Sequence, residues 1–135
     1  MRVVVDTPVW SLALRRHSPP GHGHVAELTH LIREGRVGIV GPIRQEILSG
    51  IRDRPVFERL RDHLQGFPDE VLVTGDYERA AEHFNACRAK GLQGSNTDFL
   101  LCAVAERRAW PILTTDLDFA RYAQFLPIRL HVLRA

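Results

Sequence analysis

Five acidic residues stand where a fold could bring their carboxylates together. Asp6 directly follows three valines, and a buried apolar strand does not normally end on a bare carboxylate. The other four are Glu46 in "PIRQEILSGI", Asp98 in "GSNTDFLLCAVA", and Asp116 and Asp118 in "ILTTDLDF". Carboxylates within a few ångströms raise one another's pKa, so a fold keeps such a cluster when a divalent cation neutralises it. Oxygen ligands without Cys or His favour Mg²⁺ or Mn²⁺ over zinc, and these ions support the hydrolysis of phosphodiester bonds.

Taken singly, the two earlier acids also have structural interpretations. Asp6 could cap a following helix, although Thr7, just before Pro8, stands in the better capping position. Glu46 borders the apolar helical stripe formed by Ile43, Ile47 and Ile51. An acid at the border of a buried helix face either points into a cleft or is solvated, and the spacing alone leaves both open.

The three later acids have structural interpretations as well. Asp98 follows residues 95–97, any of which could be an N-cap, and the helix dipole favours a negative charge in the first turn. The "FLLCAVA" that follows is almost entirely apolar, so this helix is expected to be buried and its first turn to face a site. Asp116 could cap the next helix, and Asp118 could lie in its first turn. The conjunction of all five acids is what favours a shared metal site.

Apolar runs and helical periodicities alternate along the chain. Strands are expected at residues 2–6, 37–40, 70–73, 111–116 and 128–133, and helices after Thr7-Pro8 and at 25–35, 41–51, 55–66, 76–91, 95–108 and 117–125, with a loop at 17–24. The alternation predicts an α/β fold with a parallel sheet covered on both faces. Sites in such sheets lie at the carboxyl ends of the strands, so Asp6 and Asp116 are expected at one edge.

Length and composition limit the class of protein. The 135 residues suit a single domain, 1–135, and the 44% apolar and 25% charged residues are ordinary for a soluble globular protein. No apolar run approaches the roughly 18 residues of a membrane-spanning helix, and the first valines are too few for a secretory signal, so a cytoplasmic location is expected. Cys87 and Cys102 lack metal-binding or redox spacing and are expected to be buried thiols.

The sequence motifs that carry the acids resemble those of one known family. In this order and spacing, "VVVDTPVW", "RQEILSGI", "GSNTDFLLCAVA" and "ILTTDLDF" resemble PIN-domain ribonucleases, and among these the VapC-type toxins of bacterial toxin–antitoxin pairs. The resemblance covers essentially the whole chain. It implies a three-layer α/β/α fold with a parallel sheet of four to five strands. It also implies Mg²⁺-dependent endonucleolytic cleavage of RNA, with Mn²⁺ as a possible substitute.

The resemblance also implies roles for individual residues and partners. The acidic quartet is Asp6, Glu46, Asp98 and Asp116, with Asp118 as an additional acid at the metal. Thr114 matches a hydroxyl residue two places before the fourth acid and is expected to act in catalysis. Thr7 matches the Ser or Thr that often follows the first acid and is expected to contact substrate. The family further implies a homodimer and a small antitoxin that blocks the site. No membrane association is expected, because no apolar run is long enough to span a membrane.

Other functions that use strand-end acids fit less well. A phospho-receiver domain needs a lysine at the end of a late strand, and the only lysine, Lys90, lies in a predicted helix. A haloacid-dehalogenase-type phosphatase needs its DxD after the first strand, whereas this DxD lies near the C-terminus. A non-catalytic RNA-binding or interaction module remains the alternative, because it would bind RNA without cleaving it.

Basic residues and histidines leave their roles open. Arginine makes up all but one of the 18 basic residues and suits phosphate contacts, but GC-rich coding also favours it, so the net charge of +2 alone does not predict nucleic-acid binding. Arg44 and Arg52 flank Glu46 and are candidates to bind substrate phosphates, or they are solvated helix residues. His22 and His24 could chelate a transition metal, although a solvated loop is favoured for them.

Overall fold

The structure is a computed structural model that describes residues 1–14 and 22–134. Three short parallel strands lie at its centre: β1 (Val3–Val5), β2 (Val37–Gly38) and β3 (Ile112–Leu113), in the order β2-β1-β3. Val4 of β1 pairs with Gly38 on one side and with Ile112 on the other. All three valines of β1 are fully buried, as expected for a central strand covered on both faces.

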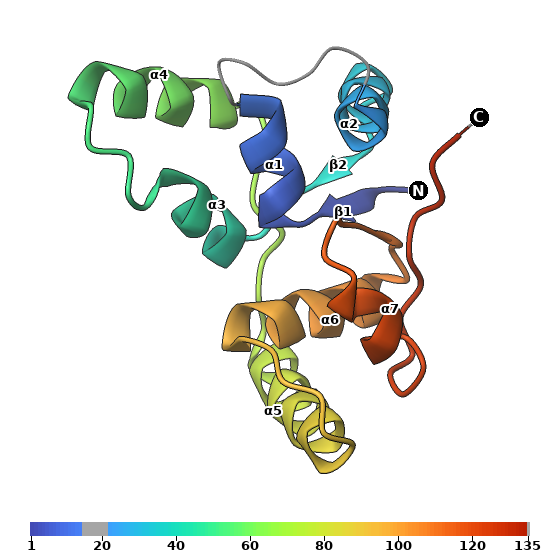
Figure 1. The fold of residues 1–135 in the computed structure, drawn as a ribbon. Coiled ribbons are helices and arrows are strands. Elements are labelled where there is room, and N and C mark those ends of the chain that lie inside the picture. Colours follow the sequence, from blue (N-terminus) through green and yellow to red (C-terminus); the bar gives the residue numbers. More distant parts are fainter. Residues whose placement is uncertain (15–21, 135) are drawn as a thin grey trace.

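Seven helices of the described residues surround this sheet in the predicted three-layer α/β/α arrangement. They are α1 (Thr7–Leu14), α2 (Gly23–Arg33), α3 (Gly41–Leu48), α4 (Arg54–Leu64), α5 (Thr74–Ala89), α6 (Asn96–Arg108) and α7 (Asp118–Tyr122). Figure 1 shows α1 to α4 on one side of the strands and α5, α6 and α7 on the other. Every helix expected from the sequence is present, and α5 ends before Gly91, whose φ of +77° suits glycine. No described helix has the length and apolar character that crossing a membrane requires.

The sheet has fewer strands than the four to five predicted. Residues 70–73 and 128–133 form no named strand, and each of these regions meets the sheet at a single parallel bridge, Ile39 with Asp69 and Ile112 with Leu130. Val71 is 74% and Val73 46% exposed, so of the apolar side chains that predicted a strand there only Leu72 packs against the core.

The C-terminal segment is instead fixed by side chains of α2. Glu27 is 2% exposed, and its carboxylate contacts His131 Nε2 at 2.5 Å and Arg134 Nε at 2.8 Å. A buried carboxylate needs such partners, and here they come from the last residues described. The segment is thus held by these contacts together with the two backbone hydrogen bonds of its single bridge to Ile112.

Helix α6 is the most deeply buried helix, as its apolar sequence predicted. Every residue from Phe99 to Ala105 is buried. Its C-terminal turn is joined to α5 through Arg107, which contacts the buried carboxylate of Asp76 at 2.7 Å, and through Glu106, which contacts His83 at 2.8 Å. These pairs fix the angle of α6, and so the direction in which its first turn points. Cys102 of α6 and Cys87 of α5 are buried free thiols, as predicted.

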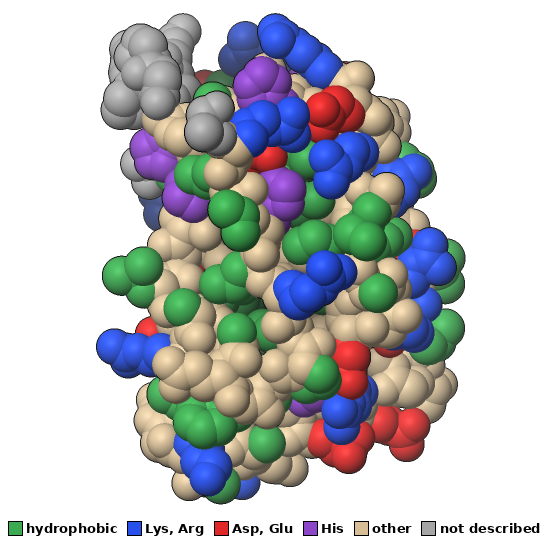
Figure 2. Space-filling view, turned by 90° about the vertical axis from the view of Figure 1, so that its right-hand side faces the viewer, with side chains coloured by type: hydrophobic (Ala, Val, Ile, Leu, Met, Phe, Trp, Pro, Cys, Tyr) green, Lys and Arg blue, Asp and Glu red, His purple; other side chains and the backbone are tan. Residues whose placement is uncertain are grey.

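The amino ends of the strands carry arginines. Arg36 donates to the carbonyl of Met1 at 2.9 Å, Arg2 to the carbonyl of Val37 at 2.9 Å, and Arg129 to the carbonyl of Ala109 at 3.1 Å. Neutral carbonyls accept from all three guanidinium groups, and Arg36 also pairs with Glu34 Oε1 at 3.3 Å. Figure 2 shows basic side chains outnumbering acidic ones over the upper half of the face that it turns to the viewer.

Candidate active site at the carboxyl edge of the sheet

Asp6 stands at the junction of β1 and α1. Its carbonyl accepts the N–H of Val9 at 3.2 Å, and α1 begins at the next residue, Thr7. The N-cap predicted at Thr7 is therefore wrong by one residue, because Asp6 itself precedes the helix. Its side chain is only 3% exposed, which is unusual for a carboxylate.

Two hydrogen bonds hold the Asp6 carboxylate. The backbone N–H of Thr7 donates to Oδ1 at 2.9 Å, and the hydroxyl of Thr114 donates to Oδ2 at 2.8 Å. Thr114 directly follows β3, the neighbour of β1, so the parallel register brings it to Asp6. The same Thr114 hydroxyl accepts the N–H of Asp116 at 3.0 Å, and Asp116 Oδ1 accepts the N–H of Asp118 at 2.9 Å. A chain of hydrogen bonds therefore links the "TTDLD" turn to the carboxylate of Asp6.

Glu46 reaches the same edge from α3. The hydroxyl of Thr7 donates to Glu46 Oε1 at 2.6 Å, although 39 residues separate the two in the sequence. The residue is exposed, so its carboxylate is held at the rim and not in the core. Thr7 therefore orients an acid of the predicted quartet, and the substrate contact expected of it stays a prediction.

Asp98 is held by a reciprocal capping box at the start of α6. Ser95 is the N-cap and accepts the N–H of Asp98 at 3.1 Å through its hydroxyl, while Asp98 Oδ2 accepts the N–H of Ser95 at 3.0 Å. The capping interpretation of Asp98 is therefore correct, and it does not compete with a place in the site. Residues 95–97 were all candidate caps, and the S-x-x-D spacing of "SNTD" is the signal that identifies Ser95.

The pKa values show that these acids share one electrostatic environment. Burial raises the pKa of Asp6 to about 6, the charges of Asp98 and Asp116 add to the rise, and the bonds from Thr114 and Thr7 oppose it. Burial also raises the pKa of Asp98, with further contributions from the charges of Asp116 and Glu46. Acids from four separate segments therefore repel one another at one edge, as the sequence analysis expected.

The fifth acid lies further outside. Asp118 is the first residue of α7, and its side chain is 50% exposed and 3.8 Å from Arg121. This exposed position fits the accessory role that the family resemblance implied.

The donor set fits a hard cation. Of the residues that the structure describes, no three His, Cys, Asp or Glu side chains converge as a preformed metal cage, and His22 and His24 belong to no such group. Mg²⁺ does not require a cage, because it keeps several waters and binds through one or two carboxylates. Carboxylates that raise one another's pKa are the groups that such an ion would relieve.

The two arginines next to Glu46 have different environments. Arg44 is committed to intramolecular partners: its guanidinium donates to Asp69 Oδ1 at 3.0 Å, to the carbonyl of Leu64 at 2.9 Å and to the carbonyl of Phe67. It therefore joins α3 to the segment after α4, which the sequence did not indicate. Arg52 is exposed.

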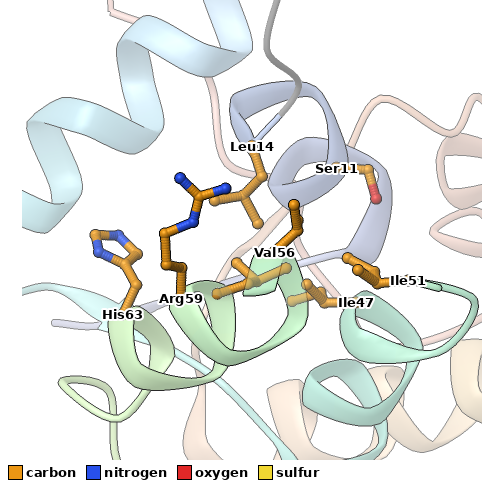
Figure 3. Close-up of a pocket in the computed structure, with 8 residues that line it drawn as sticks. Ser11, Leu14, Ile47, Ile51, Val56, Arg59 and His63 are labelled. Atoms are coloured by element: carbon orange, nitrogen blue, oxygen red, sulfur yellow. The ribbon is translucent and has the colours of Figure 1, made fainter. Parts of the chain in front are cut away.

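A separate apolar groove of about 570 Å³ lies between α1, α3 and α4. It is lined by Ser11, Leu14, Ile47, Ile51, Val56, Arg59, Leu60 and His63. Figure 3 shows Leu14, Ile47 and Val56 facing a common space, with Arg59 and His63 along α4. The groove contains none of the five acids, but it shares α1 with Thr7 and α3 with Glu46.

Comparison with known proteins gives consistent results. The family model for the PIN domain matches residues 3–124. The chain is 31% identical over 121 residues to "VapC ribonuclease Mb1587" of Mycobacterium bovis and to "Ribonuclease VapC11" of Mycobacterium tuberculosis, covering 87% of this chain and 88% of each relative.

Two solved structures share the fold. "FitAcB from Neisseria gonorrhoeae" has a TM-score of 0.75 over 96% of both chains, at 18% identity. "VapBC2 from Rickettsia felis bound to a DNA fragment from their promoter" has a TM-score of 0.77 over 97% of this chain and 98% of that one, also at 18% identity. At 18% identity, these two structures show similarity of fold alone.

Proposed function

The chain belongs to the PIN-domain family, and on that premise we propose that it is the ribonuclease toxin of a toxin–antitoxin pair. It would hydrolyse RNA phosphodiester bonds endonucleolytically, with Mg²⁺, or Mn²⁺ in its place, at the acidic edge of the sheet. The observation that carries the proposal is the buried Asp6, whose pKa is raised to about 6 by burial and by the charges of Asp98 and Asp116. A fold gains nothing in stability from such an arrangement, so a function is its best explanation.

The roles of the residues follow from their positions. Asp6, Asp98 and Asp116 are proposed to hold the cation, directly or through the waters that Mg²⁺ keeps, with Glu46 and Asp118 nearer the rim. The ion, when bound, would neutralise phosphate charge and lower the pKa of a water molecule. Thr114 fixes the Asp6 carboxylate by its hydrogen bond to Oδ2.

Glu46 has a different proposed role at the rim. Its carboxylate is exposed and is held through one oxygen by Thr7. It is therefore proposed to accept a proton from attacking water.

An antitoxin partner is proposed for the apolar groove between α1, α3 and α4 (Figure 3). Its lining fits the apolar face of a helix, and Arg59 at its margin fits an acidic residue beside that face. A partner seated there would touch the two helices that carry Thr7 and Glu46. The homodimer and the cytoplasmic location remain predictions.

A non-catalytic RNA-binding module is the second candidate, favoured by the arginines at the amino ends of the strands. Arg2 and Arg129 donate to neutral carbonyls and lie on the edge opposite the acids, and Arg36 beside them also pairs with Glu34. Phosphate binding by such a surface would not require cleavage.

One experiment separates the two functions. Antitoxin-free protein is incubated with total RNA and Mg²⁺, and the new RNA ends are sequenced, with EDTA and Asp116→Asn as matched controls. The nuclease proposal expects new ends at defined positions that vanish in both controls. RNA binding without new ends in Mg²⁺ or Mn²⁺ would refute it in favour of the binding module.

A further inference from the structure

Tyr122 joins the two segments that carry Asp98 and Asp116. It is the last residue of α7, which begins at Asp118, and it is 1% exposed. Its hydroxyl donates to the carbonyl of Gln93 at 2.6 Å, in the loop just before the capping box of Asp98. One buried side chain thus ties the helix after Asp116 to the loop before α6.

The loop backbone lies directly against this hydroxyl. A Cβ added at Gly94 would stand 2.4 Å from Tyr122 Oη and 3.0 Å from the ring of Phe99, so the loop approaches Tyr122 as closely as only glycine permits. The next residue is Ser95, whose N–H holds Asp98 Oδ2. Any movement of the loop away from Tyr122 would therefore move the donor that fixes the Asp98 carboxylate.

Aromatic packing supports the same link. The Tyr122 ring lies 5.0 Å from that of Phe99 and 5.3 Å from that of Phe119, centroid to centroid. Phe99 adjoins Asp98 in the chain, and Phe119 adjoins Asp118. Burial raises the pKa of the Tyr122 phenol, with the charges of Asp98, Asp118 and Asp116 adding to the rise, so the hydroxyl stays protonated and can donate.

We propose that Tyr122 is a positioning residue that sets where Asp98 stands relative to Asp116, and thereby the affinity of the acidic cluster for a divalent cation. The proposal rests on the proposed function in one respect, namely that these acids bind a cation together. The competing explanation is that a buried phenol merely satisfies its own hydrogen-bonding need. That explanation predicts a loss of overall stability but no change in cation affinity.

Tyr122→Phe tests the proposal because it removes the hydroxyl and keeps the ring. Two quantities are measured without RNA: the dissociation constant for Mn²⁺, from the paramagnetic signal of the free ion, and the hydrogen-exchange rate of the Ser95 amide. Both are expected to rise roughly three- to tenfold, the factor that corresponds to one net hydrogen bond. The Mg²⁺ concentration for half-maximal RNA cleavage should rise in parallel.

Two further variants sharpen the test. Tyr77→Phe, at the only other tyrosine, removes a hydroxyl from a side chain that is 56% exposed and should leave both quantities unchanged. Gly94→Ala places a methyl group against the Tyr122 hydroxyl, which should push the loop away from Tyr122 and weaken Mn²⁺ binding as well. In the double variant with Tyr122→Phe the closest obstructing atom is gone, so the two losses should be less than additive.

The outcomes distinguish this proposal from the proposed function. A lower melting temperature for Tyr122→Phe with unchanged Mn²⁺ affinity would overturn the positioning role. A wild-type protein that binds Mn²⁺ but leaves RNA intact would refute the nuclease, whereas a weakened Mn²⁺ affinity in Tyr122→Phe would still support the positioning role. A wild-type protein that binds no Mn²⁺ at all would refute both.

Discussion

Replacing Asp6 by Asn should stabilise the metal-free protein at neutral pH and destabilise it in acid. The folded-state pKa of Asp6 is about 6, against an ordinary value of 3.8. An acid whose pKa is raised on folding contributes stability that is fully present below pH 3.8 and is lost as the pH rises through 6. The difference of about 2 pKa units corresponds to about 3 kcal/mol of folding free energy lost by pH 7.5. Asn carries no charge and escapes this loss.

The substitution also has a cost that does not depend on pH. Both carboxylate oxygens of Asp6 accept hydrogen bonds, from Thr7 N–H and from the Thr114 hydroxyl. The Asn carbonyl can accept only one of them, and the lost bond costs about 1 kcal/mol. The net effect is a gain of about 2 kcal/mol at pH 7.5 and a loss of about 1 kcal/mol below pH 4. The two stability curves should cross between about pH 4 and pH 5.

The assay is thermal unfolding of wild type and Asp6→Asn in EDTA from pH 4 to pH 8. For a chain of this length, 2 kcal/mol corresponds to a melting temperature higher by roughly 6–10 °C at pH 7.5. Titrations of groups that do not interact with Asp6 cancel in the difference. Added Mg²⁺ should raise the melting temperature of wild type more than that of the variant. A variant that melts below wild type at every pH would show that the Asp6 carboxylate is not strained by burial, and the electrostatic basis of the site would fail.

Three further predictions concern other acids and the groove. Asp116→Asn should lower RNA cleavage at least about a hundredfold, whereas Asp118→Asn, at an exposed position, should lower it less than tenfold; equal losses in a cleavage assay would mean that the fourth acid is wrongly assigned. Asp98→Asn keeps an oxygen to accept from Ser95 but loses the charge, so it should melt above wild type in EDTA and cleave at background level. A variant less stable than wild type by about 1 kcal/mol would show that the charge serves only the helix start. Val56→Asp, in the groove, should abolish co-purification of the antitoxin while the isolated variant still cleaves RNA; retention of the antitoxin would place the partner elsewhere.

The sequence predicted the elements whose signals are local. Helix α6 was predicted from seven apolar residues after a polar start, and the strand before Asp6 from three consecutive valines, because burial on all sides produces such runs directly. The strands predicted at the two edges of the sheet did not form, because residues there are not buried on all sides. Residues 70–73 have strand-like side chains, yet Val71 faces solvent. The local pattern does not show which way a side chain points where pairing with the sheet ends after a single bridge.

Contacts between distant residues were beyond the reach of local patterns. Thr7 has every feature of a helix cap, and its actual partner is Glu46, on another helix. Arg44 has the position of a phosphate ligand, and its donors are taken by the turn after α4. Both outcomes depend on how α3 packs against its neighbours, which the spacing within one helix does not encode.

Asp98 shows why local and functional interpretations need not compete. The capping box uses Oδ2 of its carboxylate, and among the described residues no hydrogen bond goes to Oδ1. The cap fixes the side-chain rotamer, and the dipole of a buried helix favours the charge that burial and the neighbouring acids oppose. A carboxylate binds a cation more readily when it is oriented before the ion arrives and when its ionised form is favoured. The helix start supplies both conditions, so the feature that offered a purely structural explanation of Asp98 is also what would make it an effective ligand.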